Sequence, residues 1–290
     1  GQHQYVLDQR PGSMDPEDYA EIGGLWEALE RKGLEFYNFG EANETAHVRE
    51  TWSDTATGAA HGVMVPMQKA LYPRTSTNYA GYNMNIPDQF RMNQFEDEFT
   101  KMWIKGDEVM PSLIAVQIPN DHTASPRPED GYFSSASYVA DNDLAVGRIL
   151  HFLSRTKYWQ NMLVIITEDD PQGGVDHIDA HRSILMMAGP YVKKGYISHT
   201  HANFGSILKV IYNILGAPYV NQYDVTASLL QDFFTPTPDY TPYTVEPHDP
   251  RVFNADKAMS KYNRWVDWKT IMQGPEMDDV KVIKKEFKNH

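Results

Sequence analysis

Two apolar segments of this sequence end in side chains that could bind a cation. The first, residues 112–118, is followed closely by Asp121 and His122, and the second leads into an acidic triplet that includes Asp169 and Asp170. Carboxylates this close together raise one another's pKa or require a counter-cation. The pattern therefore predicts these four residues as ligands of a divalent metal ion. The alternative is that the triplet only caps the next element or lies solvated in a loop.

A second polar group follows the acidic triplet and combines histidine with aspartate. Residues 176–181 contain two histidines and two aspartates, after a Gly-Gly pair that allows close backbone approach. If the segment is helical, His177 and His181 share one face and could contact a metal or a phosphate. Arg182 could bind phosphate oxygens with two parallel hydrogen bonds, or form a structural ion pair. His201 precedes an expected helix, and functional and structural interpretations of it are equally open.

The apolar segments themselves indicate a sheet that could bring these groups together. Residues 112–118, 162–167 and 183–188 are continuous apolar runs of the kind found in strands buried on both faces. A helix over 138–155 joins the first two strands, which predicts a right-handed βαβ unit. In open α/β sheets, ligands bind outside the carboxyl ends of the strands. Asp121, with its neighbour, and the acidic triplet are therefore expected at one crevice.

The remaining pattern alternates helices and strands, as in an α/β protein. We expect one domain over residues 1–235 and, over 236–290, a Pro-rich stretch with a helical appendage. Within the first, the periodicity predicts helices over 16–32, from Asp88 to about 103, over 201–215 and over 225–233, a strand over 34–39, and an irregular insertion at about 51–87.

Composition excludes several classes of protein. The chain has 290 residues, 41% of them hydrophobic, which is enough for a substantial core. A formal net charge of −13, with only 26 Lys and Arg, argues against nucleic acid as a partner. There are no cysteines, and no segment approaches the roughly 20 apolar residues of a transmembrane helix. The sequence also lacks a phosphate-binding glycine loop, a Gly-x-Ser-x-Gly elbow and a His-Glu-x-x-His motif.

Three motifs together resemble a known family. Residues 119–123 (Pro-Asn-Asp-His-Thr), 166–170 (Ile-Thr-Glu-Asp-Asp) and 176–183 are similar to the bacterial phosphoesterases that include phospholipase C and acid phosphatase relatives, within the alkaline phosphatase superfamily. The similarity covers most of residues 20–235. It implies a three-layer α/β/α sandwich with a mostly parallel sheet. It also implies a divalent metal (zinc, calcium or manganese) and hydrolysis of a phosphomonoester, a phosphodiester or a phospholipid headgroup.

The resemblance also assigns roles to the candidate residues. It implies metal ligation by Asp169 and Asp170 and makes Asp121 and His122 further residues of the site. It carries over His177, His181 and His201 as metal or phosphate contacts, and we expect His181 and Arg182 to be catalytic and His177 and His201 to bind substrate. It further implies an exported protein, periplasmic or secreted, although no signal peptide is present in this sequence.

One part of the family's pattern is missing. Family members begin with a strand ending in Glu-Asn and then present a Ser or Thr nucleophile, and neither is found here. We therefore expect the first strand to be missing and an upstream domain or chain to complete the site. The alternative is a non-catalytic remnant or metal-binding module of the same fold. A calcium-binding structural domain is a third interpretation, which predicts metal affinity without hydrolysis.

Overall fold

The computed structural model describes residues 23–45, 52–53, 60–61, 64–66, 68–169 and 182–262 of a mixed α/β chain. The chain divides into two compact units: a first unit of Gly1–Asn142 with Asp249–His290, and a second unit of Asp143–His248. Helix α4 (Ser135–Leu153) begins in the first unit and ends in the second. The α/β class is confirmed. The domain boundary expected near residue 235 stays a prediction.

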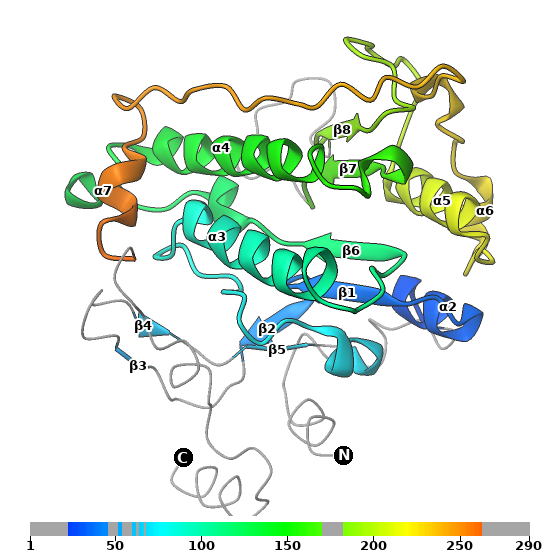
Figure 1. The fold of residues 1–290 in the computed structure, drawn as a ribbon, viewed down its shortest axis with the longest axis horizontal. Coiled ribbons are helices and arrows are strands. Elements are labelled where there is room, and N and C mark those ends of the chain that lie inside the picture. Colours follow the sequence, from blue (N-terminus) through cyan, green and yellow to red (C-terminus); the bar gives the residue numbers. More distant parts are fainter. Residues whose placement is uncertain are drawn as a thin grey trace, which may run out of the picture. The chain divides into compact units, whose positions relative to one another are not determined.

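A parallel pair of strands forms the centre of the first unit. Strand β1 (Phe36–Phe39) pairs with β6 (Leu113–Val116) so that Phe36 faces Leu113 and Phe39 faces Val116. Figure 1 shows the two strands side by side. The strand expected over 112–118 is thus confirmed in its central part. Helix α2 (Leu25–Lys32) precedes β1 and ends at Gly33, whose φ of 71° is a conformation that glycine adopts without strain.

Helix α3 (Asp88–Phe99) supplies most of the aromatic core of the first unit. It continues as a short π-helix, Thr100–Ile104, which fits the helix expected to about residue 103. Phe95 packs edge-on against Phe39 of β1, with ring centroids 5.0 Å apart. Edge-to-face contacts of this kind add to the free energy of burial. The buried aromatic residues of this core are Trp26, Phe36, Phe39, Tyr79, Phe95, Phe99 and Trp103.

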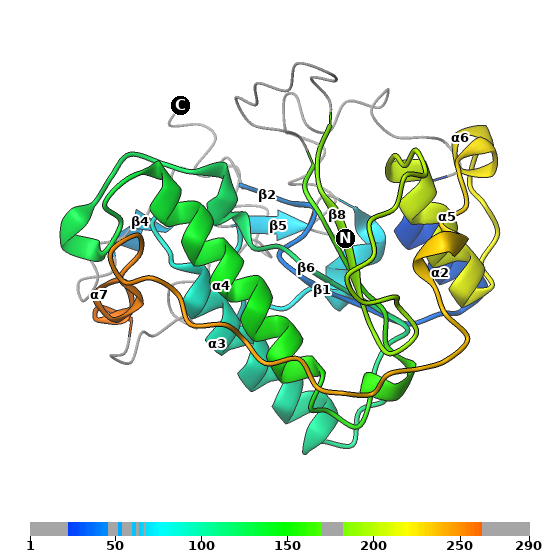
Figure 2. The ribbon, with the colours of Figure 1, turned by 90° about the horizontal axis from the view of Figure 1, so that it is seen from above.

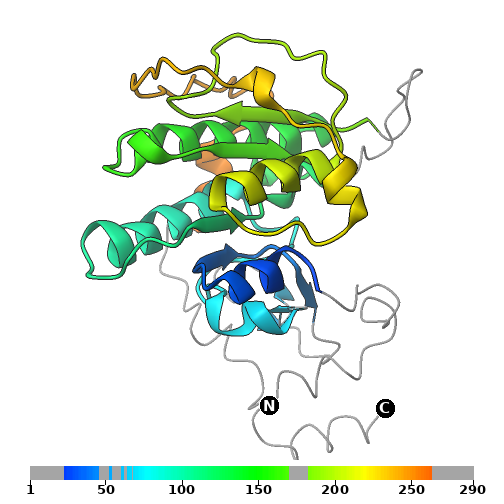
Figure 3. The ribbon, with the colours of Figure 1, turned by 90° about the vertical axis from the view of Figure 1, so that its right-hand side faces the viewer.

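Between β1 and α3 the described residues form short antiparallel ladders. Strand β2 (Asn43–Thr45) pairs with β5 (Met64–Pro66), as Figure 2 shows, and β3 (Trp52–Ser53) pairs with β4 (Ala60–His61). The 3₁₀ helix η2 (Lys69–Arg74) then packs against α2, visible in cyan beside the blue helix in Figure 3. The insertion expected to be irregular therefore contains some regular pairing.

The second unit contains an antiparallel pair. Strand β7 (Val164–Thr167) runs antiparallel to β8 (Leu185–Ala188), whereas the sequence indicated a mostly parallel sheet. Two side-chain hydrogen bonds close the end of this ladder, because Thr167 Oγ1 donates to the Ile184 carbonyl and Ser183 Oγ to that of Glu168. The residues of β7 and β8 are half-buried or exposed rather than fully buried.

Two helices follow in the second unit. Helix α5 (Phe204–Leu215) begins at Asn203, whose side chain accepts a hydrogen bond from the Ser206 N–H, and ends at Gly216. Helix α6 (Gln222–Thr226) is short, and a 3₁₀ helix, Gln231–Phe233, comes after it. The helix expected over 225–233 is therefore wrong. Lys209 Nζ donates to the carbonyls of Val225 and Ala227, which satisfies carbonyl groups where α6 ends.

The chain returns to the first unit after an extended stretch. Helix α7 (Ala255–Met259) is the helical part of the C-terminal region that the structure describes. It lies near the 3₁₀ helix Pro128–Asp130, and Lys261 Nζ forms an ion pair of 2.7 Å with Asp130. Within the described ranges, no helix combines the length and apolar character needed to cross a bilayer.

We predict that Phe39→Ala destabilises the protein by about 3–5 kcal/mol, because it removes a fully buried ring that contacts Phe95. Urea denaturation followed by circular dichroism measures the free energy of unfolding. Val109, which is 90% exposed, is the control, and its replacement by Ala should change that energy by less than about 0.5 kcal/mol. Equal effects of the two substitutions would contradict the assigned core.

Candidate active site at the end of strand β6

Asp121 and His122 lie in a 3₁₀ helix, Pro119–His122, that directly follows β6. Asp121 is half-buried and His122 is exposed, so solvent reaches both side chains. Their position matches the expectation that the polar residues come directly after the carboxyl end of this strand. A carboxylate and an imidazole on adjacent residues can bind a cation, transfer a proton or orient a hydroxyl group.

The backbone is unusual after both strands of the parallel pair. Among the described residues, positive φ outside glycine occurs at Ala42 (51°), three residues after β1, and at Thr123 (63°), directly after His122. Thr123 has a ψ of 159°, which belongs to a region used almost only by glycine. Such strain persists where surrounding contacts determine the backbone, and it gathers at functional sites. Unusual backbone conformations therefore follow both strands of the parallel pair, near the candidate residues.

Asn120 connects this turn to the interior of the first unit by hydrogen bonds. Its side chain is fully buried, and its Nδ2 donates to Asp141 Oδ2 at 2.7 Å and to the Ile86 carbonyl at 3.2 Å. Its backbone N–H donates to Asp88 Oδ2 at 3.1 Å. Among the described residues, no donor binds the buried Oδ1 atom. The acceptors around Nδ2 set the orientation of the side-chain amide.

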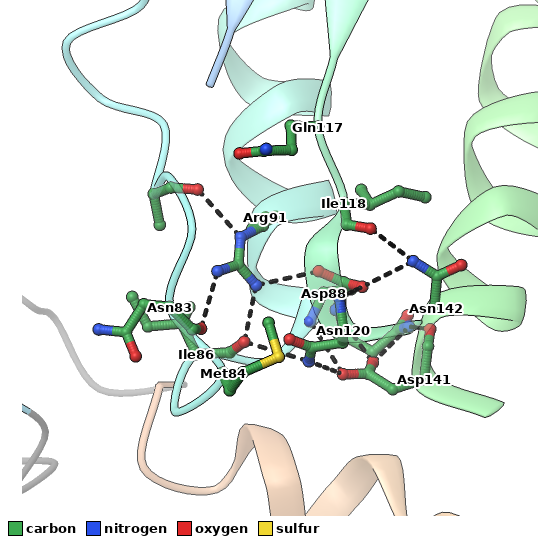
Figure 4. A network of polar contacts seen from close by, with 12 residues as sticks. Asn83, Met84, Ile86, Asp88, Arg91, Gln117, Ile118, Asn120, Asp141 and Asn142 are labelled. Atoms are coloured by element: carbon green, nitrogen blue, oxygen red, sulfur yellow. Dashed lines mark hydrogen bonds and ion pairs between the residues drawn. The ribbon is translucent and has the colours of Figure 1, made fainter. Parts of the chain in front are cut away.

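The Asp141 carboxylate joins the 3₁₀ helix Pro119–His122 to helix α3, as the dashed lines of Figure 4 show in part. Pro87, the residue before α3, has no side chain that can cap the helix. Asp141 replaces that cap, since its carboxylate accepts from the backbone N–H groups of Asp88 and Gln89 at 2.9 and 3.3 Å. It also accepts from the side chains of Gln89, Asn120 and Tyr132. The carboxylate is thus buried but fully satisfied.

Asp88 and Arg91 form a fully buried ion pair with a distance of 2.9 Å. Arg91 uses its other N–H groups on backbone carbonyls of residues 80–86, which fixes that loop. The pKa of Asp88 is raised to about 7. Burial is the largest cause, and the nearby Asp141 charge acts in the same direction, while Arg91 lowers the pKa. Asn142 Nδ2 also donates to Asp88 Oδ2 at 3.2 Å and to the Ile118 carbonyl at 2.6 Å (Figure 4).

His122 is held at the surface by two neighbours. Its Nδ1 lies 3.4 Å from the Thr123 carbonyl, a geometry that favours a proton on Nδ1 and leaves Nε2 as the acceptor nitrogen. The Tyr82 ring meets the imidazole edge to face, with centroids 5.6 Å apart and an interplanar angle of 90°. A neutral imidazole in this tautomer can accept a proton or bind a metal through Nε2.

The other predicted site residues that the structure describes belong to the second unit. Asp169 is exposed in a bend after β7, Arg182 is exposed before β8, and His201 is exposed before α5. Asp170, His177 and His181 lie outside the described residues. Of the predicted residues, the structure thus brings together Asp121 and His122, and the expected crevice shared with the acidic triplet stays a prediction.

The described residues contain part of a metal site at most. Among them, no three histidine or acidic side chains gather closely enough to hold an ion. Asp121 and His122 nevertheless offer donor types that divalent metals bind.

No family model matches the chain, and no curated protein matches its sequence.

The buried network is the part of the site that the sequence did not reveal. Asp88, where the sequence predicts the helix to begin, lies in the first turn of α3 and pairs with Arg91. The spacing of an acid and an arginine three residues apart in a helix was one available signal. Nothing in the sequence near Asp141 indicates that its carboxylate caps a different helix.

We predict that Asp141→Ala costs about 3–5 kcal/mol of folding free energy, because it leaves buried donors from three residues and a helix terminus without an acceptor. Denaturant unfolding monitored by tryptophan fluorescence tests this. Asp143→Ala in the same helix, at an exposed position, serves as the control and should be nearly neutral. A similar small loss for both variants would contradict the capping role.

The Asp88 carboxyl predicts a pH dependence of stability. Because its folded pKa of about 7 exceeds the usual 3.8, its contribution is present below about pH 4 and is lost as pH rises through about 7. Each pKa unit corresponds to about 1.4 kcal/mol. The free energy of unfolding should therefore fall between pH 4 and 7 more steeply in the wild type than in Asp88→Asn. Parallel pH profiles would refute the assignment.

Proposed function

We propose that this chain is a metal-dependent hydrolase of phosphate esters built on an alkaline-phosphatase-like scaffold, with a three-layer α/β/α sandwich and a mostly parallel sheet. The observation that carries the proposal is the position of Asp121 and His122. They follow a strand of a parallel pair, on a strained turn that a buried polar network holds in place. The same residues belong to the motif by which the sequence resembles phosphoesterases.

The properties of this turn suit metal binding beside an ester. His122 is exposed beside a half-buried carboxylate, and its contact with the Thr123 carbonyl favours Nε2 as the nitrogen that would bind the metal. The turn cannot easily relax, because Asn120 ties it to Asp88 and Asp141 in the interior. Fixed orientation of this kind lowers the entropic cost of reaching a productive geometry.

A divalent metal fits the donor types of this region. Asp121 and His122 would hold it together with Asp169 and Asp170, and the metal would stabilise negative charge on the phosphoryl oxygens. His177, His181, Arg182 and His201 would contact the phosphate. The substrate is a phosphomonoester, a phosphodiester or a phospholipid headgroup, and the proposal includes export to the periplasm or secretion. The attacking hydroxyl is expected from an upstream segment or chain.

Hydrolysis of p-nitrophenyl phosphate and its bis-ester tests the proposal. The chain is assayed alone and extended upstream by its natural sequence, with zinc, calcium or manganese and then with excess chelator. We expect turnover that the chelator abolishes, and a loss on the order of 100-fold in Asp121→Asn and in His122→Ala.

The matched control is Asp107→Asn, which neutralises an exposed carboxylate outside the turn and should retain full activity. Elemental analysis of each protein reports metal content separately from activity. Stoichiometric metal without turnover in the extended chain would support a binding module instead. Neither metal nor turnover in either form would overturn the enzyme proposal.

A further inference from the structure

Tyr82 is an exposed aromatic residue on a loop that is otherwise rigid and mostly internal. Its side chain is 42% exposed, while Ala80 and Ile86 on either side of it are almost fully buried. The exposed part of this side chain is apolar surface that a bound group can cover. Tyrosine in such a position is favoured where one face of the ring meets a ligand, because the ring provides large contact area with few rotatable bonds.

The backbone of this loop is fixed by side chains from three other elements of the first unit. Arg91 binds it from α3, Arg127 from the segment before α4, and Tyr262 from the segment after α7. The carbonyls that accept are those of Ala80, Gly81, Asn83 and Ile86 for Arg91, Met84 for Arg127 and Asn85 for Tyr262. Figure 4 shows Arg91 reaching across to Asn83 and Ile86.

The ring of Tyr82 lies directly beside the proposed reacting groups. Its centroid is 5.6 Å from that of His122, in a perpendicular arrangement. The ion pair of Asp88 and Arg91 links the two, since Asp88 also binds the backbone of Asn120 in the turn that carries His122. The loop that carries Tyr82 and the turn that carries His122 are therefore held in a fixed relative position. A group bound against Tyr82 would lie at a defined distance from the imidazole.

We propose that Tyr82 is a specificity-determining residue that binds a planar apolar group on the alcohol side of the ester, next to the phosphoryl group. This inference rests on the proposed function and names the kind of substrate it favours. Stacking on an exposed aromatic ring requires no charged partner, so the ring discriminates by shape and apolar area. Aryl esters are therefore preferred over esters of small polar alcohols.

Binding of phenyl phosphate and inorganic phosphate, measured by isothermal titration calorimetry on the full chain with manganese, tests the inference. Phenyl phosphate should bind the wild type roughly three- to tenfold more tightly than inorganic phosphate, since an aromatic contact contributes about that much. Tyr82→Ala should remove the difference and leave the affinity for inorganic phosphate unchanged. Tyr82→Phe should retain it, because the hydroxyl is not needed for stacking.

The control is Tyr240→Ala, which removes a tyrosine of similar exposure (48%) in the second unit and should keep the preference. Circular dichroism establishes that each variant is folded. A wild type that binds both compounds equally, or a Tyr82→Ala variant that still prefers phenyl phosphate, overturns the role of Tyr82 alone. A wild type that binds neither compound overturns it together with the proposed phosphate site.

Discussion

The buried ion pair of Asp88 and Arg91 is the interaction on which the rest of the site depends. Both side chains are fully excluded from solvent, so each charge must be compensated within the protein. Arg91 is compensated by Asp88 and by backbone carbonyls of one loop, and Asp88 by Arg91, Asn142 and the N–H of Asn120. The surface turn and the surface loop are thus two ends of one interior network.

The main effect of this network is to fix the positions of the groups it binds, rather than to stabilise the fold. Bringing two charges into the interior costs solvation energy that their attraction offsets only when other hydrogen bonds are present. A well-packed apolar pair would do as well for stability. It would not, however, fix backbone carbonyls and a helix terminus at the same time, as Asp141 and Arg91 do. The strained Thr123 is tolerated because Asn120 leaves the turn little freedom.

The sequence predicted helices and strands whose residues carry a local signal. It did not predict features that depend on contacts between residues far apart in the chain. Continuous apolar runs located β6, β7 and β8, and Gly216 marked the end of α5. The direction of β8 could not be read, because a run of apolar residues carries no information about its partner. The helix expected over 225–233 does not form, because α6 ends at Thr226, where Lys209 of α5 binds the carbonyls of Val225 and Ala227. Asp121 and His122 were found at a strand end, but their buried support came from three separate segments of the chain.

The contacts of Arg91 have an evolutionary consequence. Apart from Asp88, every group it holds is a backbone carbonyl, which all amino acids possess. The path of the loop is therefore independent of the side chains it displays. Substitutions at exposed loop positions such as Tyr82 and Asn85 can alter what the surface recognises without altering its shape. Divergent sequences can therefore keep the path of this loop while changing what its surface binds through a few exposed positions.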